Sequence, residues 1–175
     1  AVICPDKITT DQWLEVMQIA HELGLRSTAT IMFGHVERPI HWARHLLRLL
    51  ELQCQTGGFT EFVLLPFVHM ETPIYLKGRA RRGPTFNESV LMHAVARLVF
   101  NKHIPNIQAS RVKLGPEGVK VCLEAGANDA GGTLMDETIT RPAGAKFVQE
   151  MPPERLETLI IEMDRRPKQR TALYG

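Results

Sequence analysis

S-T-A-T-I-M-F-G-H-V-E, Ser27 to Glu37, decides the fold together with T-G-G-F-T-E-F-V-L-L-P-F, Thr56 to Phe67. Thr28, Thr30 and Met32 alternate there with Ala29, Ile31 and Phe33, which is typical of a strand with two different faces. Pro39 suits the first turn of the helix that follows, and the glycine pair at 57–58 suits its end. Glu61 to Phe67 is a second predicted strand. Strand, polar loop, amphipathic helix and strand predict a β/α unit with parallel strands.

The same alternation continues along the chain. Two capping boxes, Thr9 with Gln12 and Thr85 with Glu88, predict helix starts. The helices after Thr9, Pro39 and Thr85 are expected to bury these residues: Trp13, Val16, Met17, Ala20 and Leu23; Ala43, Leu46, Leu47 and Leu50; Val90, Leu91, Ala94, Val95 and Leu98. Further strands are predicted at 1–4, 108–114 and 131–137, and further helices after 115–116 and 152–153. The order leaves two architectures open, half of a β/α barrel and a small open sheet.

Composition restricts the class of protein. The chain has 175 residues, 44% of them hydrophobic, which is enough for one core but fewer than the roughly 250 residues of a complete (β/α)8 barrel. A formal net charge of +2 gives no single-sign field, so we expect a small-molecule partner and neither nucleic acid nor membrane. The sequence has no apolar run that could span a bilayer and no signal peptide, so we expect a cytoplasmic protein.

The first residues and the cysteines give two more expectations. A-V-I-C at 1–4 reads like the middle of a buried strand, so we expect the sequence to be truncated at its N-terminus. Cys4, Cys54 and Cys122 are far apart and odd in number, which favours reduced thiols over disulfides. Their spacing matches no metal-binding motif, and we assign no metal ligand in this chain.

Candidate site residues follow the strands, because β/α barrels carry their chemistry at the carboxyl ends of the strands. They are Gly34, His35 and Glu37; His69; Arg111 and Lys113; and Glu137. On the predicted strand 108–114, Arg111 and Lys113 share one face, where an inward cation needs a carboxylate or an anionic substrate. The alternative for Arg111 and Lys113 is a structural ion pair with Glu37 or Glu137. The alternative for the other candidates is an ordinary residue in a solvated loop.

Four ordered blocks carry a resemblance to a known family. They are I-C-P-D-K-I-T-T-D-Q-W (3–13), S-T-A-T-I-M-F-G-H-V-E (27–37), L-R-L-L-E-L-Q-C-Q-T-G-G-F (47–59) and E-A-G-A-N-D-A-G-G-T-L-M-D-E (124–137). Together they resemble the radical S-adenosylmethionine enzymes of deazaflavin and menaquinone biosynthesis, most closely the deazaflavin branch. The resemblance implies an α/β fold: the C-terminal half of a radical-SAM (β/α) TIM-type barrel over 1–137, and a C-terminal extension with one helix over 138–175.

The resemblance also implies a chemistry. In this family a 4Fe-4S cluster cleaves S-adenosylmethionine to a 5'-deoxyadenosyl radical, which attacks tyrosine. The 4-hydroxybenzyl fragment is then joined to 5-amino-6-(D-ribitylamino)uracil on the route to the deazaflavin chromophore FO. The C-x-x-x-C-x-x-C motif that holds the cluster is absent here. We therefore expect this chain to need the missing N-terminal half of the barrel as its partner, and to be inactive alone.

The family's G-x-I-x-G-x-x-E type motif maps onto the strand end and loop at 30–37, with Thr30 in place of its first glycine. The resemblance implies that the S-adenosylmethionine-binding residues are Thr30, Ile31, Gly34, Glu37 and Pro66. By position, the substrate-binding residues are His35, His69, Arg111, Lys113 and Glu137. No catalytic residue is assigned.

Three other interpretations remain open at this level. The chain is alternatively a relative from the menaquinone pathway, or a half-barrel that has lost its cluster and serves as a binding module. A third interpretation is an unrelated metal-dependent barrel hydrolase that uses His35 and His69.

Overall fold

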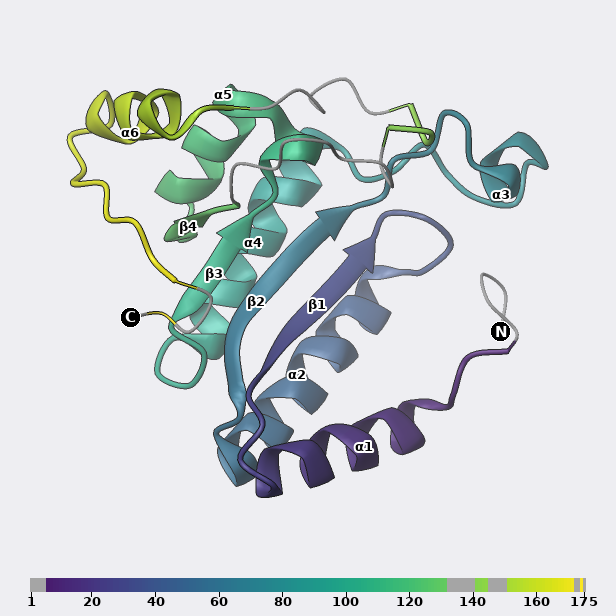
Figure 1. The fold of residues 1–175 in the computed structure, drawn as a ribbon. Helices are drawn as coiled ribbons and strands as arrows, with labels where there is room; N and C mark the ends of the chain where they lie inside the picture. The colour runs from purple at the N-terminus through teal and green to yellow at the C-terminus, as the bar shows by residue number, and fades with distance from the viewer. Residues whose placement is uncertain (1–5, 132–140, 145–150, 172–173, 175) are drawn as a thin grey trace.

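The computed structural model describes residues 6–131, 141–144, 151–171 and 174. Helices and strands alternate along the chain (Figure 1). In order, the elements are α1 (Thr10–Glu22), β1 (Ser27–Phe33), α2 (Pro39–Thr56), β2 (Phe59–Pro66), α3 (Pro73–Leu76), α4 (Phe86–Phe100), β3 (Asn106–Ala109), α5 (Arg111–Glu124), β4 (Asp129–Ala130) and α6 (Pro153–Ile161). No helix in these ranges is long and apolar enough to cross a membrane.

The four strands form one parallel sheet in the order β1-β2-β3-β4. Helices α2 and α4 both lie behind this sheet, and α5 lies on the same side of it (Figure 1). A β/α barrel has this sequential order with its helices on the outer face, whereas a doubly wound sheet reverses its order and has helices on both faces. The predicted α/β class is confirmed, and the arrangement is consistent with the C-terminal part of a barrel. The predicted domain boundary at 137 and 138 lies outside the described residues.

The core lies between the sheet and the helices. In β1, in β3 and in β2 from Phe62 on, every second residue points into it, as the pleat of a strand requires. Its buried side chains include Ala29, Ile31 and Phe33 of β1, Phe62 and Leu64 of β2, Ile107 and Ala109 of β3, and Trp42, Leu46 and Leu49 of α2. Each large apolar side chain buried in this way contributes about 1.5–3 kcal/mol to folding.

Most predicted helix boundaries are confirmed. Both capping boxes form, so that Thr9 and Thr85 accept a hydrogen bond from the third helical residue. Helix α2 begins at Pro39 and ends before Gly57, which is left-handed. Strand β2 begins at Phe59, two residues earlier than predicted.

The predicted strand at 108–114 is wrong in its second half. Strand β3 ends at Ala109, and Arg111 is already the first residue of α5. The helix is interrupted at Gly115, where φ is 72° and ψ is 173°. Four residues that alternate between charged and apolar are equally compatible with a single helical turn, and that ambiguity produced the error. Arg111 and Lys113 therefore do not share a strand face.

The first and last predicted strands, at 1–4 and 131–137, lie mostly outside the described residues. The structure contains β4 as a two-residue strand, Asp129–Ala130, just before the predicted strand at 131–137. That predicted strand lies, from residue 132 on, outside the described residues, as does the predicted strand at 1–4. The predicted final helix is confirmed as α6.

Three helices depart from the predicted buried face, and the predicted Val16 of α1 and Leu23 at its end are 56% and 74% exposed. In α2, Leu47 is 59% exposed while Leu49 and Leu52 are buried. In α4, Leu98 is 80% exposed, whereas His93 is fully buried. The prediction counted only apolar residues and so excluded His93, whose Nδ1 lies 2.7 Å from the carbonyl oxygen of Ser89 within the same helix. A buried polar side chain with a partner on its own helix shifts the buried face without any apolar signal.

Candidate binding site at the carboxyl edge of the sheet

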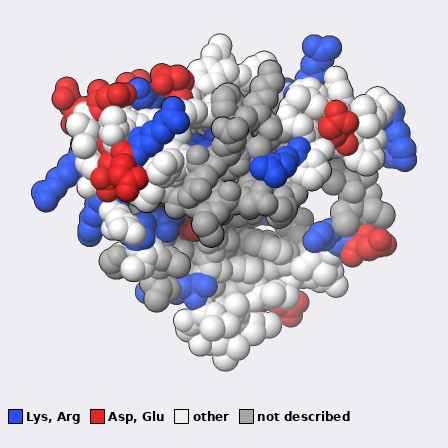
Figure 2. All heavy atoms as spheres, turned by 45° about the horizontal axis from the view of Figure 1, so that its top comes forward, with Lys and Arg blue, Asp and Glu red and all other residues white. Residues whose placement is uncertain are grey.

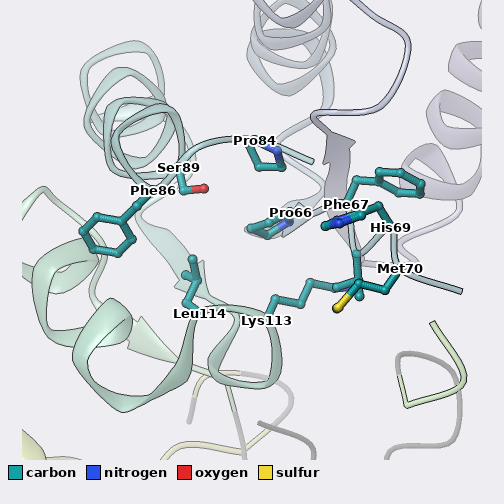
Figure 3. Close-up of a pocket in the computed structure, with 10 residues that line it drawn as sticks. Pro66, Phe67, His69, Met70, Pro84, Phe86, Ser89, Lys113 and Leu114 are labelled. Atoms are coloured by element: carbon teal, nitrogen blue, oxygen red, sulfur yellow. The ribbon is translucent and has the colours of Figure 1, made fainter. Parts of the chain in front are cut away.

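A cavity of about 250 Å³ opens at the carboxyl end of β2. Its walls come from the segment after β2, the start of α4 and the first turn of α5 (Figure 3). The lining residues are Pro66, Phe67, Val68, His69, Met70, Pro84, Phe86, Ser89, Lys113 and Leu114. Most of the lining is apolar, and a few polar groups converge on it, which is the usual character of a small-molecule site. It lies at the edge of the sheet where barrel enzymes place their active sites.

Three predicted site residues meet in this pocket: Pro66, His69 and Lys113. Lys113 extends from α5 across the cavity toward Met70 and His69 (Figure 3). The loop that carries His69 is fixed by Thr72, whose hydroxyl and backbone N–H both donate to the His69 carbonyl oxygen at 2.7 and 2.8 Å. An imidazole and an ammonium group therefore converge on one mostly apolar cavity.

The loop after β1 is organised around the carboxylate of Glu37. This group accepts hydrogen bonds from the backbone N–H groups of Gly34, of His35 at 2.9 Å and of Val36 at 3.0 Å, and from the Trp42 indole at 2.7 Å. Burial raises the pKa of Glu37, but the hydrogen bonds from Gly34, Trp42 and His35 outweigh burial and hold it below its ordinary value. The ionised carboxylate thus fixes the loop in one conformation.

His35 connects this loop to the pocket wall. Its Nδ1 lies 2.6 Å from Glu37 Oε2, and its ring packs edge-on against Phe67 with the centroids 5.7 Å apart. Phe67 is itself part of the pocket lining. His35 therefore stands behind the cavity wall and supports it.

Residues 81–84 join the loop after β1 to the pocket. Gly34 has a φ of 93°, and a Cβ atom there would lie 2.2 Å from Pro84 Cδ. The Arg81 N–H donates to the His35 carbonyl oxygen at 3.0 Å. The Arg81 guanidinium pairs with both carboxylate oxygens of Glu88 at 2.9 and 3.0 Å. The start of α4 is thereby tied to the β1 loop and to the pocket.

Thr30 and Ile31 lie on opposite faces of β1. Thr30 is on the open face of the sheet, and its carbonyl oxygen accepts a hydrogen bond from His45 Nε2 at 2.9 Å. Ile31 is 7% exposed and belongs to the core on the helix side. A ligand on the open face would meet Ile31 only through its backbone.

The remaining predicted residues do not join this pocket. Arg111 is buried in the first turn of α5, where burial lowers the pKa of its guanidinium. Glu137 lies outside the described residues.

The sequence analysis assigned no site role to Trp42 or to Arg81, and both tie the site together. A signal for Trp42 did exist, since a tryptophan on the buried side of a helix needs an acceptor for its indole N–H, and Glu37 lies five residues earlier.

The described residues do not provide a cluster site. Within them, no three His, Cys, Asp or Glu side chains come together as potential metal ligands. Cys54 is exposed on α2 and Cys122 is buried on α5.

The surface around the carboxyl edge carries charges of both signs. Figure 2 turns the top of Figure 1 toward the viewer and shows both acidic and basic side chains around the rim.

Residues 56–175 match the protein family described as CofH/MqnC C-terminal region. This chain belongs to that family. The match begins at the end of α2, so the CofH/MqnC region contains every residue of the pocket, while the Gly34–Glu37 loop precedes it. The resemblance inferred from the sequence is confirmed.

Curated relatives match nearly the whole chain. A 5-amino-6-(D-ribitylamino)uracil--L-tyrosine 4-hydroxyphenyl transferase of Methanopyrus kandleri is 52% identical over 98% of the chain and 47% of the relative. The protein of the same name from Methanocaldococcus jannaschii is 47% identical over 99% of the chain and 48% of the relative. An FO synthase of Streptomyces avermitilis is 50% identical over 99% of the chain and 20% of its own length. The chain therefore spans about half of these transferases and a fifth of this FO synthase.

Proposed function

We propose that this chain forms the substrate-binding part of a radical S-adenosylmethionine transferase that joins the 4-hydroxybenzyl group of tyrosine to 5-amino-6-(D-ribitylamino)uracil. The observation that carries the proposal is the pocket at the carboxyl edge of the sheet, with Lys113 and His69 in its wall. The names of the relatives support the deazaflavin branch over the menaquinone branch. We also propose a cytoplasmic location, which fits the dispersed cysteines.

Within the site, the proposal divides the residues between two ligands. Thr30, Ile31, Gly34, Glu37 and Pro66 border S-adenosylmethionine, with Glu37 acting through the loop that it fixes. The substrates take the pocket, where the Lys113 ammonium is placed to pair with the carboxylate of tyrosine and the apolar lining to pack against its ring. His69 borders the same ligand, and His35 supports the wall.

The cluster chemistry has no site among the described residues, and we assign them no step that involves it. In this proposal the 4Fe-4S cluster is held by the part of the longer enzyme that corresponds to the other half of the relatives. That N-terminal half of the barrel is the partner of this chain. The pocket walls then orient the substrates and exclude water.

Titration calorimetry of the chain with tyrosine, and separately with 5-amino-6-(D-ribitylamino)uracil, tests the proposal. Lys113→Met should weaken tyrosine binding about tenfold or more, because a hydrogen bond to a charged group contributes about 1.5–3 kcal/mol. Lys102→Met, which removes an exposed lysine just after α4, is the matched control and should leave binding unchanged. Tyrosine affinity that is the same in both variants would contradict this assignment of the pocket.

A further inference from the structure

Arg170 and Tyr174 of the C-terminal tail lie on the face of the sheet that the helices leave open. Arg170 Nε donates to Asp129 Oδ2 at 2.8 Å, and its Nη2 contacts both Asp129 and Glu61. The Tyr174 hydroxyl donates to Glu61 and lies 3.0 Å from Asp129. The Arg170 guanidinium stacks over the Tyr174 ring at 4.3 Å. Two tail side chains thus hold two carboxylates of the sheet.

The sheet holds these two carboxylates close together on one face. Glu61 of β2 and Asp129 of β4 point to the same face, and Gln108 of β3 lies between them, with its Nε2 at 3.2 and 3.4 Å from the two groups. The Glu61 and Asp129 side chains are only 14% and 10% exposed. Two carboxylates removed from water at close range need a cation, and Arg170 provides it.

The position of this contact separates it from the pocket. Glu61 is the third residue of β2 and Asp129 is the first of β4, so both lie near the amino ends of their strands. The pocket lies at the carboxyl end of β2. In Figure 1 the tail leaves α6 and descends beside β4 and β3 toward their lower end. Tail and pocket therefore lie at opposite ends of the strands.

We propose that the C-terminal tail is a strap, held by Arg170 and Tyr174 on Glu61 and Asp129, that closes the amino end of the open sheet face over β2 to β4. Within the described residues, the strap then blocks the approach of small molecules at the amino ends of β2 to β4, whereas the carboxyl ends of the strands stay open. The strap is independent of which substrate the pocket takes. Burial and the neighbouring Glu61 raise the pKa of Tyr174, so its hydroxyl stays protonated as a donor.

Limited trypsin digestion tests the strap, because the tail contains cleavage sites after Lys168 and Arg170. The exposed loop sites after Arg79 and Arg82 serve as an internal reference. In the wild-type chain we expect cleavage after Arg170 to be at least tenfold slower than after Arg82. The double substitution Glu61→Gln and Asp129→Asn should raise cleavage after Arg170 about tenfold and leave the loop sites unchanged. Glu117→Gln, at an exposed carboxylate of α5, should change nothing.

A second variant separates release of the strap from unfolding. If the double substitution destabilised the whole sheet, cleavage after Arg44 in α2 would also rise. Tyr174→Phe changes only the tail, and we expect it to accelerate cleavage after Lys168 and Arg170 several-fold with no change at Arg44. Wild-type cleavage after Arg170 as fast as after Arg82 would overturn the proposal. So would unchanged tail cleavage in Tyr174→Phe.

Discussion

Gly34 and Glu37 show how single residues set the shape of the candidate site. Glu37 binds the N–H groups of its own loop and the indole of Trp42, so one carboxylate holds the loop and the start of α2 together. Gly34 lets that loop approach Pro84 more closely than any residue with a side chain can. The role of Glu37 here is to position backbone atoms, and any contact with a ligand comes in addition to it.

Gly34→Ala should destabilise the chain by about 2 kcal/mol more than Gly24→Ala. Both glycines have a positive φ, 93° and 81°, so both substitutions strain the backbone. Only at Gly34 does the added methyl group meet another atom, Pro84 Cδ at 2.2 Å, while nothing lies within 4 Å at Gly24. Urea unfolding followed by tryptophan fluorescence measures the difference. Equal losses in the two variants would show that the contact with Pro84 is unimportant.

The accuracy of the sequence-based predictions differs from element to element for physical reasons. The starts of α1 and α4 were predictable because a capping box is complete within four residues. The helical turn at 111–114 was not, since the choice between strand and helix there depends on how α5 packs. Within the site, Pro66, His69 and Lys113 line one pocket, although Lys113 lies in α5 and not on the strand predicted for it. Arg111, predicted on the same strand, is buried at the start of α5 and does not line the pocket.

His21 joins α1 to three other elements. Its Nδ1 lies 2.8 Å from the Thr56 hydroxyl at the end of α2, and its Nε2 lies 2.7 Å from the Ser27 hydroxyl at the start of β1. Its ring meets Phe59 of β2 edge-on at 4.8 Å. A neutral imidazole can donate with one nitrogen and accept with the other, which satisfies both hydroxyl contacts. Helix α1 is held to the sheet by this side chain.

We expect the free energy of unfolding to fall as the pH drops below about 6.5. Burial lowers the pKa of His21, His45 and His93 in the folded chain, whereas the unfolded chain has the ordinary value of about 6.5. Below that pH the unfolded state binds more protons, and stability is lost until the folded pKa is passed. Urea unfolding at about pH 7.5 and 5.5 measures the loss, which His21→Gln should reduce. A wild-type stability independent of pH in this range would contradict the prediction.

At the scale of the whole molecule, the sheet has an unpaired edge on β1. Strand β1 pairs only with β2 in the described structure, and Met32 on its open face is 44% exposed. Edges of this kind pair readily with other chains unless something covers them. In a complete barrel the preceding strand would cover β1.

The chain on its own should therefore self-associate as its concentration rises. Met32→Lys should reduce the association severalfold, because a charge beside a strand edge opposes pairing with another strand. Leu98→Lys, which places the same charge on an exposed position of α4, is the control and should have little effect. Sedimentation velocity over a range of concentrations measures both variants. A wild-type chain that stays monomeric throughout would argue against an open edge at β1.

The strap sets an order of events during synthesis. Arg170 follows Glu61 by 109 residues and Asp129 by 41. At about 5–20 residues per second, a ribosome needs roughly 5–20 seconds to get from Glu61 to Arg170. Glu61 lacks its counter-charge throughout that interval, and Asp129 lacks it while the last 41 residues of the interval are made. The open face of this domain is thus completed only after its strands and core have been translated.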